Sequence, residues 1–177
     1  MYRLFASSLL LAASLTSPSF AAPDLLSGAT DLCKALMAGT IVQDQHFSKS
    51  DEKPKNPFGE TAYEGSWNEL PVIVAAGEKF GDALCDVQFP SATAADYVAV
   101  NAELNKALGG TGTVYDKPDG AFGYRGEIWA DKDAMDGSVE DLTVGEMPLS
   151  SIFVQYADEG FRQTAGRTGL IIEMQGR

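Results

Sequence analysis

The sequence predicts an α+β domain, in which a largely antiparallel, curved β-sheet of about six to seven strands carries two amphipathic helices on one face. Residues 83–89 alternate between apolar and polar side chains, as a half-buried strand requires. Residues 24–37 and 94–108 place apolar side chains at helical spacing. Beyond residue 108 the two-residue period returns, with turns too short for helical crossovers, so we expect antiparallel neighbours.

Residues 1–21 have the features of a secretory signal peptide. Arg3 precedes an apolar run, and small residues lead to Ala21. We therefore expect cleavage after Ala21 and one mature domain, residues 22–177. Because the apolar run is shorter than the roughly 20 residues of a bilayer span, we expect no membrane anchor and a periplasmic or secreted location.

The mature chain is strongly acidic. Without Arg3 it has 12 basic and 25 acidic residues, a net charge of −13. This balance disfavours nucleic acids and anionic membranes as partners, because both attract cationic proteins. Eight of the acids, and one base, fall between residues 131 and 159. The cluster is explained either by a solvated face that aids solubility or by a docking surface for a basic protein partner.

The two cysteines predict one disulfide. Cys33 lies on the apolar stripe of the first helix, and Cys85 lies on the apolar side of the strand at residues 83–89. In an exported chain such a pair is usually oxidised, and here the bridge would fasten the helix to the sheet. A redox role is disfavoured because the sequence has no C-x-x-C motif and neither cysteine is expected in a basic, exposed setting.

Both helices have start and stop signals. Asp24 is the expected N-cap of the first helix, which ends before Gly39. The second helix begins with a capping box between Thr93 and Asp96, and it ends at Gly109. Its predicted apolar stripe consists of Tyr97, Val98, Leu104 and Leu108.

The strands follow in chain order. A short strand is expected at residues 40–48, followed by an exposed loop at residues 49–59. Residues 61–67 and 70–76 are the next strands, and the second of these continues through a tight turn into residues 83–89 as an antiparallel hairpin. After the second helix, alternation predicts four further strands, which lie within residues 122–130, 141–144, 151–156 and 170–174.

Catalytic and cofactor motifs are scarce. His46 is the only histidine, and no G-x-S-x-G motif accompanies it, so a histidine-activated nucleophile is not expected. The segment from Asp131 to Gly137 is a poor match to a calcium loop, since a methionine occupies one ligand position, and it is better explained as a hairpin turn. We expect no catalytic residue, no metal site and no cofactor. A hydrolase that uses two carboxylates remains an alternative.

The predicted binding residues lie on one strand and in the acidic segment after it. A tryptophan beside an arginine is typical of an interface anchor. If Phe122, Tyr124 and Ile128 face the core, the residues between them project outward; otherwise Trp129 belongs to the core. The predicted binding residues are Arg125, Glu127, Trp129, Asp131 and Asp133.

Three functions remain open, and binding is favoured over catalysis. The first is an exported, non-enzymatic binding protein, such as an inhibitor or immunity-type protein that masks a basic partner. The second is a binder of a small ligand or glycan, in a cleft between the sheet and the second helix. That cleft would be lined by Tyr97, Phe122, Tyr124 and Trp129. The third is a carboxylate-based hydrolase of an envelope polymer.

Overall fold

The computed structural model describes residues 22–50, 59–117, 124–135, 137, 139–157 and 167–177. Its helices are α1 (Ala22–Met37), α2 (Ala94–Leu108) and the short α3 (Lys132–Met135). Its strands are β1 (Phe47–Ser50), β2 (Gly59–Trp67), β3 (Leu70–Lys79), β4 (Asp82–Phe89), β5 (Thr113–Lys117), β6 (Tyr124–Ala130), β7 (Thr143–Val144), β8 (Met147–Ala157) and β9 (Gly169–Gly176). The predicted α+β class with an antiparallel sheet is confirmed.

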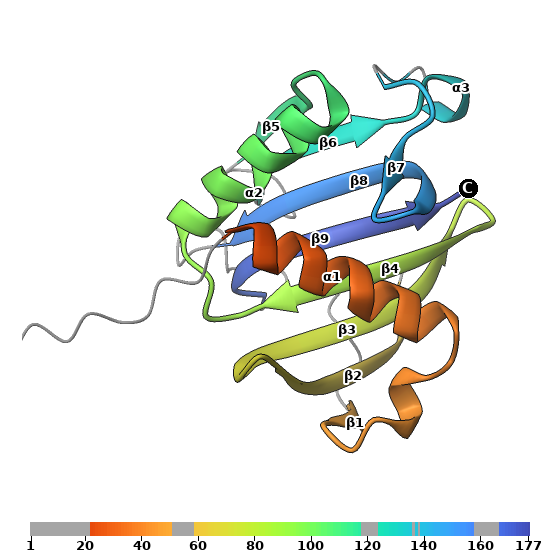
Figure 1. The fold of residues 1–177 in the computed structure, drawn as a ribbon, viewed down its shortest axis with the longest axis vertical. Helices are drawn as coiled ribbons and strands as arrows, with labels where there is room; N and C mark the ends of the chain where they lie inside the picture. Colours follow the sequence, from red (N-terminus) through yellow and green to blue (C-terminus); the bar gives the residue numbers. More distant parts are fainter. Residues whose placement is uncertain (1–21, 51–58, 118–123, 136, 138, 158–166) are drawn as a thin grey trace, which may run out of the picture.

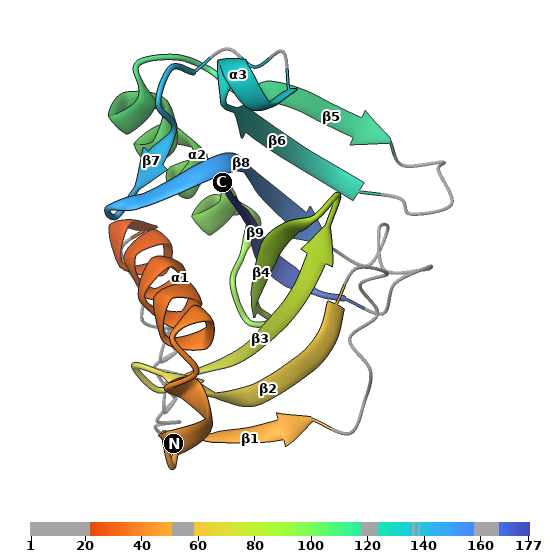
Figure 2. The same cartoon turned by 90° about the vertical axis from the view of Figure 1, so that its right-hand side faces the viewer.

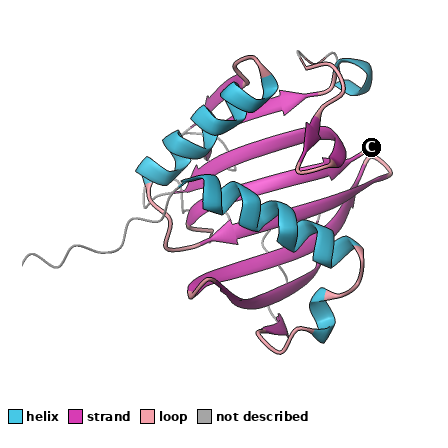
Figure 3. Cartoon of the chain, in the orientation of Figure 1, coloured by secondary structure: helices cyan, strands magenta, loops and turns pink. Residues whose placement is uncertain are grey.

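All strands belong to one antiparallel sheet in the order β1-β2-β3-β4-β9-β8-β6-β5, while β7 pairs with the start of β8 (Figure 3). The last strand, β9, lies in the middle of the sheet between β4 and β8. Helices α1 and α2 both cover the same face, α1 over β3 and β4 and α2 over β8 and β9 (Figure 1). Figure 2 shows both helices on one side of the curved sheet.

The core fills the space between the two helices and the sheet. Side chains of β3, β4, β9 and β8 that point to the helices meet those of α1 and α2. The fully buried members of this layer include Leu25, Phe89, Leu104, Ile152, Ile172 and Met174. The predicted disulfide is confirmed: Cys33 of α1 bonds to Cys85 of β4, across 52 residues of sequence.

Several local predictions are confirmed. Thr93 and Asp96 form the expected capping box, in which the Thr93 amide donates to Asp96 Oδ2 at 2.7 Å. Gly109 ends α2 in the left-handed conformation, with φ of 71°. Strands β3 and β4 form the expected antiparallel hairpin. Helix α1 begins at Ala22, two residues before the predicted start, and the side chain of Asp24 lies outside the described part of the chain.

Other predictions are wrong in detail. The expected strand at residues 40–48 is instead a 3-10 turn (Ile41–Gln43) followed by β1, because Ile41 turns inward to the core while its neighbours are exposed. Strand β5 was not predicted, because its sequence shows no apolar face. Strands β6 and β7 do not form a hairpin with each other, since both pair with β8. Of the predicted loop, residues 51–58 lie outside the described residues.

The buried stripe of α2 differs from the predicted one around Val98. Val98 is 64% exposed, whereas Val100 and Asn101 are buried. A helical period centred on Tyr97 and Leu104 places residues 100 and 101 toward the sheet and residue 98 beside it. The polar Asn101 therefore occupies a position that an apolar side chain would ordinarily fill. In the part of the chain that the structure describes, no helix is long and apolar enough to span a bilayer.

Candidate functional site

The predicted binding residues of β6 share one face, but that face points toward the helices. Cross-strand register pairs Arg125 with Tyr156 and Trp129 with Ile152, and both partners belong to the helix-facing layer. Trp129 is 0% exposed, so the expected outward anchor is wrong and the alternative of a core tryptophan holds. Its indole Nε1 donates to Asn105 Oδ1 at 3.2 Å, which gives the buried ring a polar partner under α2.

One side of α2 carries three polar or aromatic residues. Tyr97, Asn101 and Asn105 follow one another at four-residue intervals, so they occupy one side of the helix. At one end the Tyr97 and Tyr156 rings lie 6.2 Å apart, and at the other end Asn105 accepts from Trp129. We call the six residues along this contact the polar seam: Tyr97, Asn101, Asn105, Arg125, Glu127 and Trp129.

Asn101 and Glu127 occupy corresponding places in the middle of the polar seam. From Tyr97 to Asn105 the helix advances about 12 Å, and from Arg125 to Trp129 the strand advances about 13 Å. The two contacts at the ends therefore place Asn101 at the same level of the polar seam as Glu127. Both side chains are buried, with exposures of 6% and 8%.

The buried groups of the polar seam are incompletely satisfied. Glu127 Oε1 accepts from the Gly112 amide at 2.9 Å, and among the described residues no cation lies within ion-pair distance of this carboxylate. Asn101 Oδ1 has no hydrogen-bond partner, and it is the one buried side-chain oxygen or nitrogen of the described residues in this condition. A buried acceptor without a donor is costly, so its presence in a well-packed layer calls for an explanation.

Burial and the groups of the polar seam shift the pKa of Tyr97. Burial raises the pKa of its hydroxyl above the ordinary value of 10.0, and the Asn101 side chain acts in the opposite direction. Glu127 also raises the pKa of Tyr97, while Arg125 lowers it. At the open end of the seam, Arg125 forms an ion pair with Asp116 of β5, with 3.7 Å between Nε and Oδ2. Among the described residues, Glu127 has no ion-pair partner of its own.

The mouth of the polar seam is apolar. Val98 lies on the same side of α2, one turn before Asn101, and Val114 of β5 is the cross-strand neighbour of Glu127. Their side chains are 64% and 67% exposed, which makes them two of the five large apolar residues most open to solvent in the described part of the chain. The seam thus combines a polar interior with an apolar entrance.

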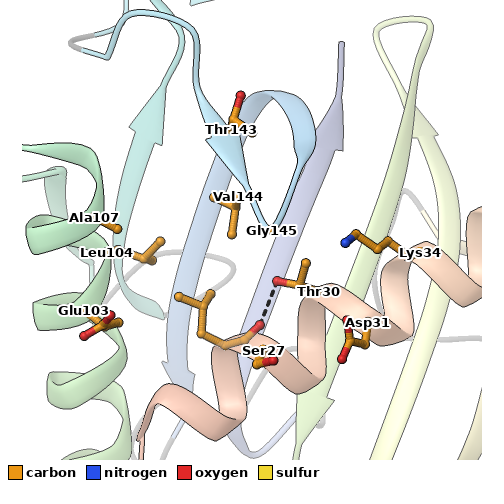
Figure 4. Close-up of a pocket in the computed structure, with 11 residues that line it drawn as sticks. Ser27, Thr30, Asp31, Lys34, Glu103, Leu104, Ala107, Thr143, Val144 and Gly145 are labelled. Carbon is orange, nitrogen blue, oxygen red and sulfur yellow. Dashed lines mark hydrogen bonds between the residues drawn. The ribbon is translucent and has the colours of Figure 1, made fainter.

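A groove lies on the other side of α2, between this helix, α1 and the turn that joins β7 to β8 (Figure 4). Its volume is about 280 Å³. Leu26, Leu104 and Val144 make an apolar floor. At Gly145 the hairpin turn approaches Thr30 of α1 so closely that a Cβ would collide with its methyl group. That approach closes one end of the groove.

The groove has an acidic rim. Asp31 on α1 and Glu103 on α2 line the groove from its two sides (Figure 4), and Glu146 lies beside the groove at the hairpin turn, near Lys34. The only base among these residues is Lys34, whose Nζ lies 4.0 Å from Glu146 Oε2. The rim therefore carries a net charge of −2 over an apolar floor.

The predicted acidic binding residues have different roles. Asp131 is buried and structural: its two carboxylate oxygens accept the amides of Asp133 and Leu142, each at 3.0 Å. Asp133 is exposed, and Arg177 Nη2 lies 3.3 Å from its Oδ2. Arg177 also lies close to Asp131 and Asp141, so its guanidinium group is the positive charge between these three carboxylates. No group of three metal-ligating side chains occurs within the described ranges.

The face of the sheet that points away from the helices carries a second buried charge cluster. Asp86 of β4 and Glu173 of β9 are direct cross-strand neighbours. Asp86 forms an ion pair with Arg167, and Lys79 Nζ donates a hydrogen bond to Glu173 Oε1 at 3.1 Å. Burial raises the pKa of Glu173 above 4.5, as does the charge of Asp86, while Lys79 and Arg167 oppose this shift. Each carboxylate in this cluster thus has its own cation.

The predicted aromatic cleft is only partly described. Tyr97 and Trp129 lie at the two ends of the polar seam, whereas Phe122 and the side chain of Tyr124 lie outside the described residues. The sequence analysis did not identify Asn101 and Asn105 as site residues. The available signal was their spacing from Tyr97, which places two amides on an otherwise apolar helix face.

The two cysteines and the histidine lie outside the polar seam and outside the lining of the groove. Both cysteines are joined in the disulfide, and His46 is exposed in a turn where its amide is bonded to Asp44. The polar seam and the groove instead offer acceptors, negative charge and apolar surface. Comparison with known proteins finds no family model, no curated protein and no solved structure that matches this chain.

Proposed function

We propose that this chain is an exported, non-enzymatic binding protein, and that the groove between α1, α2 and the β7–β8 turn receives a basic, amphipathic segment of a protein partner. The observation that carries the proposal is the acidic rim over an apolar floor. Leu26 and Val144 would take apolar side chains of the partner, while Asp31 and Glu103 would face its cations. This arrangement resembles the way amphipathic helices enter grooves in other proteins.

The size of the groove favours a protein segment over a free small molecule. Pockets for small ligands usually enclose about 300–1,000 Å³. The groove lies at the lower end, near 280 Å³, which suits one or two apolar side chains anchored from a larger surface. The net charge of −13 on the mature chain would steer a basic partner toward this rim and raise the rate of association.

Export is part of the same proposal. The signal-like residues 1–21 support it, and so does the disulfide, because such bonds form and persist in oxidising compartments. In the periplasm or outside the cell, a protein of this kind would act by masking the basic surface of its partner. The polar seam is a separate feature and is not needed for this function.

The proposal is tested by affinity capture with the mature, oxidised protein. The bait is incubated with envelope and secreted fractions of the producing cell and washed at low and then moderate salt. We expect a stoichiometric protein partner whose retention falls as salt rises, because exposed charges are screened. The variant Asp31→Lys/Glu103→Lys should lose this partner.

The matched control is Glu69→Lys/Glu78→Lys, which makes the same change in net charge at exposed positions outside the groove. It should retain the partner, apart from a small loss that reflects overall charge. Equal retention by the groove variant and the control would exclude the groove as the docking site. Recovery of no stoichiometric protein by the wild type would argue against a protein partner altogether.

A further inference from the structure

The polar seam has a shortage of hydrogen-bond donors and of positive charge at the same point. Asn101 Oδ1 is a buried acceptor without a donor, and the Glu127 carboxylate, at the same level of the seam, has a backbone amide but no cation among the described residues. The side chains at the two ends do not supply the missing group. Asn105 accepts from Trp129, Arg125 is paired with Asp116, and the hydrogen bond between the Tyr97 and Asn101 side chains leaves Oδ1 without a donor.

We propose that the polar seam is a binding site for a small primary alkylammonium compound. The ammonium group has three N–H donors and one positive charge, so a single group can donate to Asn101 Oδ1 and to the Glu127 carboxylate and neutralise the latter. The alkyl chain leaves the seam between Val98 and Val114, where it covers apolar surface that is otherwise exposed to water.

The chemistry of the seam selects this class among small ligands. A carboxylate or phosphate would meet Glu127 and the acceptor of Asn101, both of which repel it. An alcohol offers one donor and no charge, so it leaves Glu127 uncompensated. A guanidinium is planar and wide, and the close approach of Gly112 to Glu127 and Trp129, where a Cβ would lie 2.8 Å from both side chains, leaves little width beside the carboxylate. A primary ammonium group is positively charged, has three donors and is compact, so it avoids all three of these objections.

This site is distinct from the groove. The groove opens on the side of α2 that carries Glu103 and Ala107, whereas the polar seam lies on the side that carries Asn101 and Asn105. The inference therefore does not depend on the proposed protein partner, and either site can fail in experiment without the other.

The first test uses n-hexylammonium chloride with the mature, oxidised wild-type protein, followed by two-dimensional amide NMR. We expect saturable shifts at α2, β5 and β6. Hexan-1-ol should bind at least about tenfold more weakly, because hydrogen bonds to charged groups contribute roughly tenfold or more in affinity. Sodium hexanoate should produce no saturable shifts.

Two variants assign the binding to the seam. Glu127→Gln keeps the shape and removes the charge, and it should weaken hexylammonium about tenfold or more. Asn101→Leu removes the acceptor and should weaken it to a similar extent. The matched control is Glu173→Gln, the same substitution of a buried glutamate on the opposite face of the sheet, and it should keep the wild-type affinity.

Three results would overturn the inference. The first is the absence of saturable shifts in the wild type, and the second is equal affinity of hexylammonium for wild type and Glu127→Gln. The third is a crystal structure, grown with hexylammonium, in which an ordered water alone donates to Asn101 Oδ1. The comparison of hexylammonium with hexan-1-ol uses only wild-type protein, so it holds even if a variant fails to fold.

Discussion

The two faces of the sheet bury polar groups in two different ways. On the face away from the helices, Asp86 and Glu173 are buried beside Arg167 and Lys79, so each carboxylate has a cation. On the helix-covered face, Glu127 lies in the polar seam without a cation among the described residues, and Asn101 Oδ1 lacks a donor. The first cluster is complete, whereas the second is not.

The difference indicates separate roles for the two faces. Charges that satisfy one another tie strands and loops together and leave no capacity for a ligand. A site for a ligand requires groups whose partners arrive from outside, and such groups lower the stability of the empty protein. We therefore expect removal of Asp86 from the charge cluster to destabilise the fold and a substitution at Asn101 to stabilise it.

The largest expected effect concerns the disulfide that joins α1 to the helix-covered face of β4. Replacement of both Cys33 and Cys85 by serine should lower the free energy of unfolding by about 4 kcal/mol, because the bridge closes a long loop in the unfolded chain. Urea denaturation of the variant and of the oxidised wild type measures the difference. Reduced wild-type protein should match the variant. A loss below about 1 kcal/mol would show that packing of α1, rather than the covalent link, holds the helix to the sheet.

The next largest effect concerns the residue after Cys85, which points to the other face. Asp86→Ala should cost about 3 kcal/mol, because it leaves the Arg167 guanidinium buried without its partner. Asp133→Ala, at an exposed ion pair, should change stability by less than about 0.5 kcal/mol. Urea denaturation of both variants tests the contrast. Similar values for the two would mean that the charge cluster is not structural.

The sequence was sufficient to predict the layers, because they depend on local periodicity. Alternation in residues 83–89 and the capping box at Thr93 are short-range signals, and the disulfide followed from the faces of Cys33 and Cys85. The orientation of β6 was not predictable in the same way. Both of its faces are largely buried, so alternation identifies two sets of side chains without showing which set meets the helices.

The polar seam was predicted only in part, for a related reason. Arg125, Glu127 and Trp129 were expected to share a face, and they do, but their partners on α2 come from a different part of the chain. The apolar stripe predicted for α2 included Val98 in place of Asn101, because hydrophobicity alone does not anticipate a buried amide. Likewise, Asp131 was expected at a surface, but its amide contacts depend on the fold of residues that follow it.

The third prediction reverses the usual effect of a core substitution. Asn101→Leu should raise the free energy of unfolding by about 1 kcal/mol, because it removes a buried acceptor that lacks a donor, keeps the branched shape of the side chain, and gives up only the hydrogen bond with Tyr97. Thermal and urea denaturation measure the gain. Asn105→Leu is the control: it is the same substitution one turn away, but it removes the acceptor of the Trp129 indole and should destabilise the protein. Destabilisation by both would show that Asn101 is satisfied in solution.

The smallest effect is a pH dependence with opposite signs at two glutamates. Burial raises the pKa of Glu173, so the folded state keeps this proton to higher pH than the unfolded chain. Stability from Glu173 is thus fully present below about pH 4.5, the ordinary value, and is lost as pH rises through the folded-state pKa. Glu173→Gln does not titrate, so its stability relative to wild type should increase between pH 4 and pH 7, measured by urea denaturation at each pH.

The control for this prediction is the exposed Glu140, because Lys132 shifts its pKa in the other direction. The hydrogen bond and charge of Lys132 lower the pKa of Glu140, so its contribution is present above about pH 4.5 and is lost as pH falls through the folded-state pKa. Glu140→Gln should therefore gain stability relative to wild type only as the pH is lowered. Parallel pH profiles for the two variants would contradict the distinction between a desolvated carboxylate on the sheet and a solvated one in an ion pair.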